Sequence, residues 1–450
     1  MNRAAIAIMA CTLVLLSACS SVRPDYNAPL QTAAPQPGYR MRALPATPEN
    51  GNALFVATSF SGGGARAAAL AYGVLQAMRE TTVELDGRRR SLFDELDIVS
   101  AVSGGSLAAG YLAMKGDAMF PAFFDQVLMR DLQSAFMDEL FAPRQWGWMF
   151  SPRFGRGDVL AEFLDREVFE GTRYADVLRR GSRPLVVIGA TDMSQGSRFE
   201  FLQDPFDLLC SDLGSLKLAT AVAASAAVPI ALSPITLRNH AAPCPHAGNI
   251  DMYSLLGNRQ RAQLTRQTIS YLDKQQRPYI HLLDGGLSDN LATRGPLESV
   301  ALRGSLRAVA EDGGLEGMRS FVFIVVNAEG QAGNDADRSA DVPSVFRVAR
   351  AVADIPLGRY SSDSQEQLRE ALARWSQEPP GAGGRPLRTY YIEVSLQAAG
   401  LEPELQDLGR LPTALSLPPA DIRRLVEAGR RIFHRSPELA GLLDDLKLVK

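Results

Sequence analysis

The sequence has few of the residues that build metal sites. Its 450 residues include four histidines and four cysteines, and neither a C-x-x-C nor an H-x-x-x-H spacing occurs. Metal sites in proteins depend on such paired ligands. The sequence therefore predicts no metal site, and we expect no cofactor of any kind.

An excess of positive charge is also missing. There are 47 Lys and Arg against 50 Asp and Glu, for a net charge of −3, and no basic stripe runs along the chain. This balance argues against a nucleic-acid partner. No period of 20 to 50 residues indicates a solenoid or a propeller. What is present, 46% hydrophobic and 22% charged residues, is typical of a globular protein with a sizeable core, in one large or two medium domains.

The amino terminus resembles a bacterial export signal. Arg3 precedes an apolar run, Ala4 to Leu16, that is too short to span a bilayer comfortably. The run ends in Leu16-Ser17-Ala18-Cys19, which resembles a lipobox. That resemblance implies that 1–18 is a signal peptide and that Cys19 is acylated and becomes the first mature residue. An ordinary cleaved signal and a buried apolar segment are the alternatives.

The residue after the cysteine bears on localisation. Ser20, rather than Asp, implies by the same resemblance a lipid anchor in the outer membrane, facing the periplasm of a bacterial cell envelope. Residues 19–52 are rich in proline and poor in large apolar side chains, so we expect a loose tether with a reach of about 30 Å. In an oxidising compartment, Cys210 and Cys244 form either a disulfide or two buried thiols.

The stretch from Leu96 to Lys115, LDIVSAVSGGSLAAGYLAMK, predicts a buried strand, a sharp turn and a helix, with Ser103 at the corner. A serine at such a corner adopts a strained backbone and exposes its hydroxyl beyond the sheet. The residues two positions away must be small, and they are Ala101 and Gly105. The alternative is an ordinary Gly-Ser loop before a helix.

A glycine loop comes earlier in the chain. The expected strand Ala53 to Ser61 leads into Gly62-Gly63-Gly64-Ala65-Arg66 and then into a helix, AAALAYGVLQAMRE. Free backbone N–H groups at a helix start bind negative charge, either a phosphate or the oxyanion of an acyl transfer. G-x-G-x-x-A with Glu84 or Asp86 downstream also fits a loose dinucleotide fingerprint. An exported lipoprotein has little access to such a cofactor, which disfavours that alternative.

The order of three motifs resembles the patatin-like phospholipases. The glycine loop and the serine corner are followed by HLLDGGLSDN, in which Asp284-Gly285-Gly286 ends a short apolar strand. The segments 184–201 and 221–234 are similar to further parts of the family pattern. The resemblance covers most of 54–326. It implies an α/β fold, a three-layer α/β/α sandwich with a mostly parallel sheet, over residues 53–435, with a helical insertion at 117–181 and a tail at 436–450.

The resemblance also implies roles for the motif residues. Ser103 would be the nucleophile and Asp284 its base, brought together at the carboxyl ends of neighbouring parallel strands. Gly62, Gly63 and Gly64 would hold the oxyanion. Arg66, Ala101, Gly105, Gly285 and Gly286 would support the site, Arg66 by anchoring the loop or a headgroup phosphate. The expected substrates are phospholipids, lysophospholipids or related acyl esters.

Several alternatives stay open at this point. Asp284 could be a turn residue only. A Ser-His-Asp triad would have to recruit one of four histidines: His240, His246, His281 and His434. A non-catalytic lipid-binding or assembly lipoprotein could keep the same fold. The aromatic stretch from Trp146 to Phe150 is a lid or acyl-chain wall, or packs an inserted helical subdomain onto the sheet.

Overall fold

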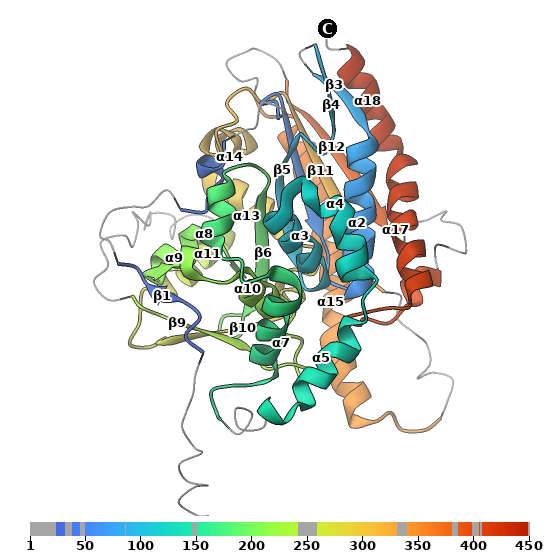
Figure 1. The fold of residues 1–450 in the computed structure, drawn as a ribbon. Helices are drawn as coiled ribbons and strands as arrows, with labels where there is room; N and C mark the ends of the chain where they lie inside the picture. The colour runs from blue at the N-terminus through green and yellow to red at the C-terminus, as the bar shows by residue number, and fades with distance from the viewer. Residues whose placement is uncertain are drawn as a thin grey trace, which may run out of the picture.

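A computed structural model describes residues 24–31, 38–45, 50–85, 87–145, 151–241, 259–330, 340–379, 386–397, 405 and 407–448. Its middle layer is an eight-stranded mixed sheet (Figure 1). The strands lie in the order β12-β11-β2-β5-β6-β10-β9, and β7 also pairs with β6. Their bounds are β2 (Leu54–Phe60), β5 (Leu96–Val102), β6 (Leu185–Asp192), β7 (Ser197–Glu200), β9 (Ile235–Arg238), β10 (Tyr279–Leu283), β11 (Ser320–Asn327) and β12 (Arg388–Ser395).

Five neighbouring strands, from β12 to β6, run parallel to one another, whereas β10 runs antiparallel to β6. The parallel strands are apolar on both faces because helices cover both. In β2, Leu54 and Val56 face one core while Phe55 and Ala57 face the other, as the two-residue repeat of a strand requires. β12 lies at the edge of the sheet.

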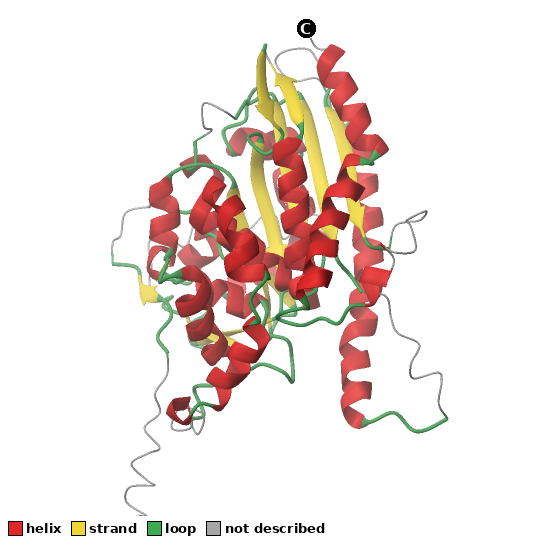
Figure 2. Cartoon of the chain, turned by 45° about the vertical axis from the view of Figure 1, so that its right-hand side comes forward, coloured by secondary structure: helices red, strands yellow, loops and turns green. Residues whose placement is uncertain are grey.

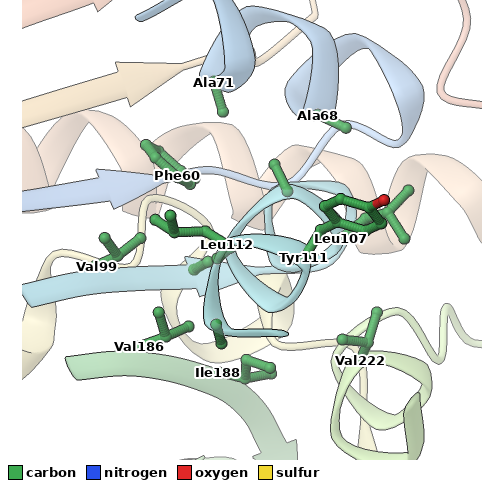
Figure 3. Close-up of a cluster of buried hydrophobic side chains, with 14 of the residues drawn as sticks. Phe60, Ala68, Ala71, Val99, Leu107, Tyr111, Leu112, Val186, Ile188 and Val222 are labelled. Atoms are coloured by element: carbon green, nitrogen blue, oxygen red, sulfur yellow. The ribbon is translucent and has the colours of Figure 1, made fainter. Parts of the chain in front are cut away.

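Helices form the two outer layers, and the predicted three-layer α/β/α sandwich is confirmed (Figures 1 and 2). One face carries α2 (Ala65–Glu80), α3 (Gly104–Lys115), α10 (Leu218–Ser225), α17 (Pro419–His434) and α18 (Pro437–Leu448). The other carries α13 (Arg294–Arg303), α14 (Leu306–Asp312) and α15 (Val345–Trp375). Figure 3 shows Val99, Val186 and Ile188 of the sheet around α3, close to Leu112. The helix that follows Ser103 is therefore fixed by the core.

The segment 117–181 is helical where it is described. It contains α4 (Met119–Phe123), α5 (Leu132–Phe141), α7 (Arg156–Leu164), α8 (Tyr174–Arg180) and short 3₁₀ and π turns at 116–118, 124–128 and 165–169. The predicted role of 146–150 lies outside the described residues and stays a prediction. The remaining elements are small: β1 (Ala28–Pro29), η1 (Met41–Ala43), β3 (Thr82–Leu85), β4 (Arg88–Ser91), α9 (Gln203–Leu208), β8 (Ser211–Asp212), η5 (Leu213–Ser215), α11 (Arg259–Ser270), α12 (Gly286–Asp289) and η8 (Asp407–Arg410).

Both ends of the chain differ from the expectation. The predicted tail holds α18, whose Leu439, Leu442 and Leu446 are buried because their spacing places them on one helix face. The predicted tether is not a loose coil over 24–31, 38–45 and 50–52. Tyr39 and Leu44 are buried in the core there, and the Val186 N–H donates to the Tyr39 hydroxyl at 2.9 Å.

Two further expectations concern membranes and cysteines. Within the described ranges, every helix is too short or too polar to cross a bilayer. Cys210 is disulfide-bonded. Cys11, Cys19 and Cys244 lie outside the described residues, so the Cys210–Cys244 pairing stays a prediction.

Candidate active site

Ser103 lies at the corner between β5 and α3, beyond the carboxyl end of the strand. Its φ of 49° and ψ of −125° fall where residues with a side chain are rare and strained. The turn is closed by close packing, since a Cβ on Gly105 would lie 2.7 Å from the carbonyl oxygens of Phe60 and Ser61. Ala101 is buried on the other side. A glycine at 105 is therefore a steric requirement of the corner.

The Ser103 hydroxyl donates a hydrogen bond to Asp284 Oδ2 at 2.8 Å, although the residues are 181 positions apart. Both side chains are buried. We expected the two residues to meet at the ends of neighbouring parallel strands. Instead, β10, which precedes Asp284, runs antiparallel to β6. Val102 pairs with Gly189 on one side of β6, and Leu283 pairs with Thr191 on the other. Ser103 and Asp284 thus meet across the end of β6, rather than at adjacent ends of parallel strands.

Burial sets the protonation behaviour of Asp284. It raises the pKa of this carboxyl to about 6, while the Gly286 N–H on Oδ1, at 2.8 Å, and the Ser103 hydroxyl act in the lowering direction. At pH 7 the carboxylate form still predominates, and it is a stronger base than an ordinary aspartate. Gly285 must be small, since a Cβ there would lie 2.8 Å from Val102 Cγ1 and closer still to Gly189, whereas a Cβ on Gly286 would lie 3.0 Å from Asp284 Oδ1.

The glycine loop lies directly against the serine corner. A Cβ on Gly62 would lie 3.5 Å from Ser103 Cβ, and one on Gly104 would overlap the backbone of Gly64. The Gly62 N–H is already used, because it donates to the Asn290 carbonyl at 3.0 Å. The N–H groups of Gly63 and Gly64 have no acceptor among the described residues. Two of the three expected oxyanion donors are therefore available.

Arg66 anchors the glycine loop through hydrogen bonds to two backbone carbonyls. Its Nε donates to the Ala328 carbonyl at 2.8 Å, and Nη1 donates to the Leu411 carbonyl. The side chain is buried, and burial lowers its pKa to about 10, which leaves it protonated at neutral pH. Contact with a headgroup phosphate is excluded by this burial. Next to it, the Ala65 N–H donates to the Ala414 carbonyl at 2.7 Å, so backbone fills the place that a dinucleotide phosphate would need.

Two residues of the site escaped sequence reasoning. Ser225 Oγ accepts the Ser103 N–H at 2.8 Å and donates to the Gly189 carbonyl at 2.6 Å, which fixes the corner to the end of β6. The sequence signal that could have identified Ser225 is that it carries the single hydroxyl in the apolar run AVAASAAV. A polar group buried in such a run needs a hydrogen-bond partner. Asn290 contributes its carbonyl to Gly62 and its Nδ2 to Ser361 on α15, at 3.3 Å. Only its position after the Asp-Gly-Gly motif pointed to it.

The histidines bond elsewhere. His281 Nδ1 pairs with Thr236 at 2.9 Å, His240 Nε2 with the Asn27 carbonyl at 2.9 Å, and His434 with Glu80 at 3.5 Å. None of these three reaches Ser103 or Asp284, and His246 lies outside the described residues. Across the described ranges, no group of three or more His, Cys, Asp or Glu side chains is arranged to hold a metal ion.

Fold and site together define a class, the α/β/α proteins in which a serine on a strained strand–helix corner faces a buried carboxylate and a glycine loop. The sequence comparison agrees with this class. Residues 58–297, more than half of the chain, match the family model described as Patatin-like phospholipase. The chain belongs to the patatin-like phospholipase family. A search of the curated proteins found no match.

Some solved structures are similar to this chain at low sequence identity. Human GIVD cytosolic phospholipase A2 is similar with a TM-score of 0.47 and 12% identity, over 88% of this chain and 63% of that one. The same human protein in complex with methyl gamma-linolenyl fluorophosphonate gives a TM-score of 0.40 at 13% identity, over 88% of this chain and 59% of that one. VipD from Legionella pneumophila gives 0.34 at 13% identity, over 94% and 71%. This chain therefore spans less than two thirds of the human protein's structures.

Proposed function

We propose that the protein is a serine acyl hydrolase that cleaves phospholipids, lysophospholipids or related lipid esters with a Ser103–Asp284 dyad. The observation that carries the proposal is the 2.8 Å hydrogen bond from Ser103 Oγ to Asp284 Oδ2, beside glycine-loop amides that no described residue accepts. Membership of the patatin-like phospholipase family supports the same substrate class.

The reaction follows from these positions. Asp284 takes the hydroxyl proton as Ser103 Oγ attacks the ester carbonyl, and the oxyanion that forms accepts hydrogen bonds from the Gly63 and Gly64 N–H groups. Collapse breaks the ester C–O bond, the leaving alcohol takes the proton from Asp284, and an acyl-Ser103 ester remains. Asp284 then deprotonates a water that attacks this ester. Fatty acid leaves, and Ser103 recovers its proton.

The raised pKa of Asp284 fits this role. A base whose pKa lies near the working pH accepts a proton at lower cost than one at 3.8. No cation is needed next to it, and its described partners are the neutral hydroxyl of Ser103 and the N–H of Gly286. A guanidinium contact would stabilise the carboxylate and weaken it as a base.

The test is release of fatty acid from mixed phospholipid vesicles and from soluble short-chain esters by wild type and Ser103→Ala. Ser194→Ala, which removes an exposed hydroxyl beyond β6, is the matched control. We expect turnover by wild type and by the control but not by Ser103→Ala. An inert wild type across all substrates would refute the hydrolase and leave the non-catalytic lipid-binding or assembly lipoprotein.

The proposal includes a lipid anchor at Cys19 that holds the protein to the outer membrane on its periplasmic side. The lipobox-like sequence Leu16-Ser17-Ala18-Cys19 supports it. Cells fed labelled palmitate should label the wild type but not Cys19→Ser. Equal labelling of both chains would refute the anchor.

A further inference from the structure

We propose that residues 226–234, here called the rim loop, dock into the surface of a phospholipid bilayer, the same bilayer that holds the Cys19 anchor. The inference rests on the proposed function for its substrate and on the anchor for its orientation. Its sequence is AAVPIALSP, without a single charged residue.

The rim loop exposes apolar side chains beside the active site. Val228 is 42% exposed and Ile230 is 54% exposed. Just before them, the Ala227 carbonyl accepts the Asp284 N–H at 3.0 Å. The loop therefore presents branched apolar groups to the solvent within a few residues of the base. Such a surface is stabilised when lipid rather than water covers it.

Ile230 is also strained. Its φ is 72°, in the left-handed region that β-branched residues avoid. Arg156 Nη2 donates to its carbonyl at 2.7 Å and holds this conformation. The exposed side chain adds little to the core in return. Strain kept at an exposed apolar residue next to a candidate active site indicates a functional use of that side chain.

Other exposed apolar side chains lie on elements that extend toward this end of the molecule. Met193 follows β6, Phe141 ends α5, and Ile355 lies in the first half of α15. Figure 2 shows α5 and the lower half of α15 projecting beyond the carboxyl end of the sheet.

The start of the chain limits how far this end can lie from residue 19. Tyr26 donates its hydroxyl to Asp158 Oδ1 at 2.7 Å, in the first turn of α7. The same turn holds the rim loop, since the Gly157 N–H donates to Ser233 Oγ at 2.9 Å. Tyr26 is only seven positions after Cys19, and seven peptide units span at most about 25 Å. A bilayer anchor at Cys19 therefore keeps α7 and the rim loop close to that bilayer.

The depth of the loop can be measured directly. The full chain with Ser103→Ala, which leaves the lipid intact, is reconstituted into vesicles of phosphatidylethanolamine and phosphatidylglycerol. An environment-sensitive fluorophore is attached at Ile230→Cys, at Val228→Cys, or at Leu302→Cys as control. Leu302 is exposed to a similar degree, but it lies in the last turn of α13, a helix next to α14, which is labelled at the upper left of Figure 1.

We expect nitroxide groups on the lipid chains to quench positions 228 and 230 several-fold more than position 302, and aqueous iodide to show the reverse order. Equal iodide quenching at all three positions would overturn the proposal. Protection from iodide without quenching by lipid nitroxide would also overturn it, because the occupant would then be a protein. Since the variant is inert, this outcome does not depend on whether wild type hydrolyses lipids.

A second variant tests the argument from strain. Asparagine tolerates the left-handed region, so Ile230→Asn should raise the thermal unfolding midpoint. A lower midpoint would assign Ile230 to folding and remove its strain as evidence for docking. Val228→Asn, at a position without positive φ, serves as the control and should leave the midpoint nearly unchanged.

Discussion

Substitution of Asp284 by asparagine should change the stability of the protein and its proposed catalytic activity in opposite directions. The carboxyl group is buried, and its described partners are two neutral donors, the Gly286 N–H and the Ser103 hydroxyl. Asparagine keeps an oxygen for Gly286 but carries no charge. We expect Asp284→Asn to lose turnover and to gain stability at neutral pH.

The magnitude follows from the pKa of Asp284. Burial raises it from 3.8 to about 6, and each unit corresponds to about 1.4 kcal/mol. The ionised carboxyl therefore costs the folded state up to about 3 kcal/mol at pH 7 or above. Because the folded pKa lies above the unfolded one, this penalty is absent below about pH 4. It grows between pH 4 and 6 and is constant at higher pH.

The assay is urea unfolding of wild type and Asp284→Asn at pH 4, 5.5 and 7.5, together with ester turnover. The stability gain should be near zero at pH 4 and approach about 3 kcal/mol at pH 7.5. Asp138→Asn, which also replaces one aspartate by asparagine but at an exposed position on α5, is the matched control. Wild-type turnover should fall as the pH drops through about 6, because protonated Asp284 cannot act as a base. Equal stability at pH 7.5, or turnover by Asp284→Asn, would refute the reasoning.

Substitutions at Ser103, Gly104 and His281 test the geometry. Ser103→Gly and Ser103→Ala both remove the hydroxyl, but only glycine adopts the φ of 49° without strain. The unfolding free energy of the glycine variant should therefore exceed that of the alanine variant by about 1 kcal/mol. Equal values would argue against a strained corner. Gly104→Ala places a Cβ on the Gly64 backbone and should lower turnover at least about 100-fold through the displaced oxyanion loop, whereas Gly441→Ala, with open space around it, should behave as wild type. His281→Ala should retain turnover within a few-fold, since its ring pairs with Thr236, and complete loss would favour a Ser-His-Asp triad.

The sequence predicted the elements whose signal is local. The apolar runs of β2 and β5 indicated buried strands, and the small residues around Ser103 indicated its corner. Asp284 could be linked to Ser103 only through the order of the motifs, because nothing local reports a contact across 181 positions. The direction of β10 was not predictable for the same reason. Its five residues fit either orientation, and pairing with β6 and β9 decides it.

Hydrogen-bond partners were the least predictable feature of the site. The Gly62 N–H belonged to the expected oxyanion donors, yet the Asn290 carbonyl accepts it. Three adjacent glycines look equivalent in a sequence, and only the fold brings a carbonyl to one of them. The prediction of a loose tether near the start of the chain was wrong for another reason. The high proline content of this segment predicted a loose coil. The composition of a whole segment does not show that two of its residues, Tyr39 and Leu44, are buried in the core.

A second buried carboxyl shows why a raised pKa alone does not identify the site. Burial raises the pKa of Asp97 to about 7, against the lowering effect of Arg183, whose Nη1 lies 2.7 Å from Oδ1. Asp97 lies on the same strand as the corner, near its other end, and its second oxygen accepts the Val56 N–H at 3.0 Å. Its donors are a guanidinium, an amide side chain and a backbone amide, and none of them is a nucleophile. Asp284 differs because one of its two donors is a hydroxyl on a strained corner, with unpaired loop amides beside it. This arrangement of neighbours, rather than the shift in pKa, makes a carboxylate able to take a proton from an attacking group.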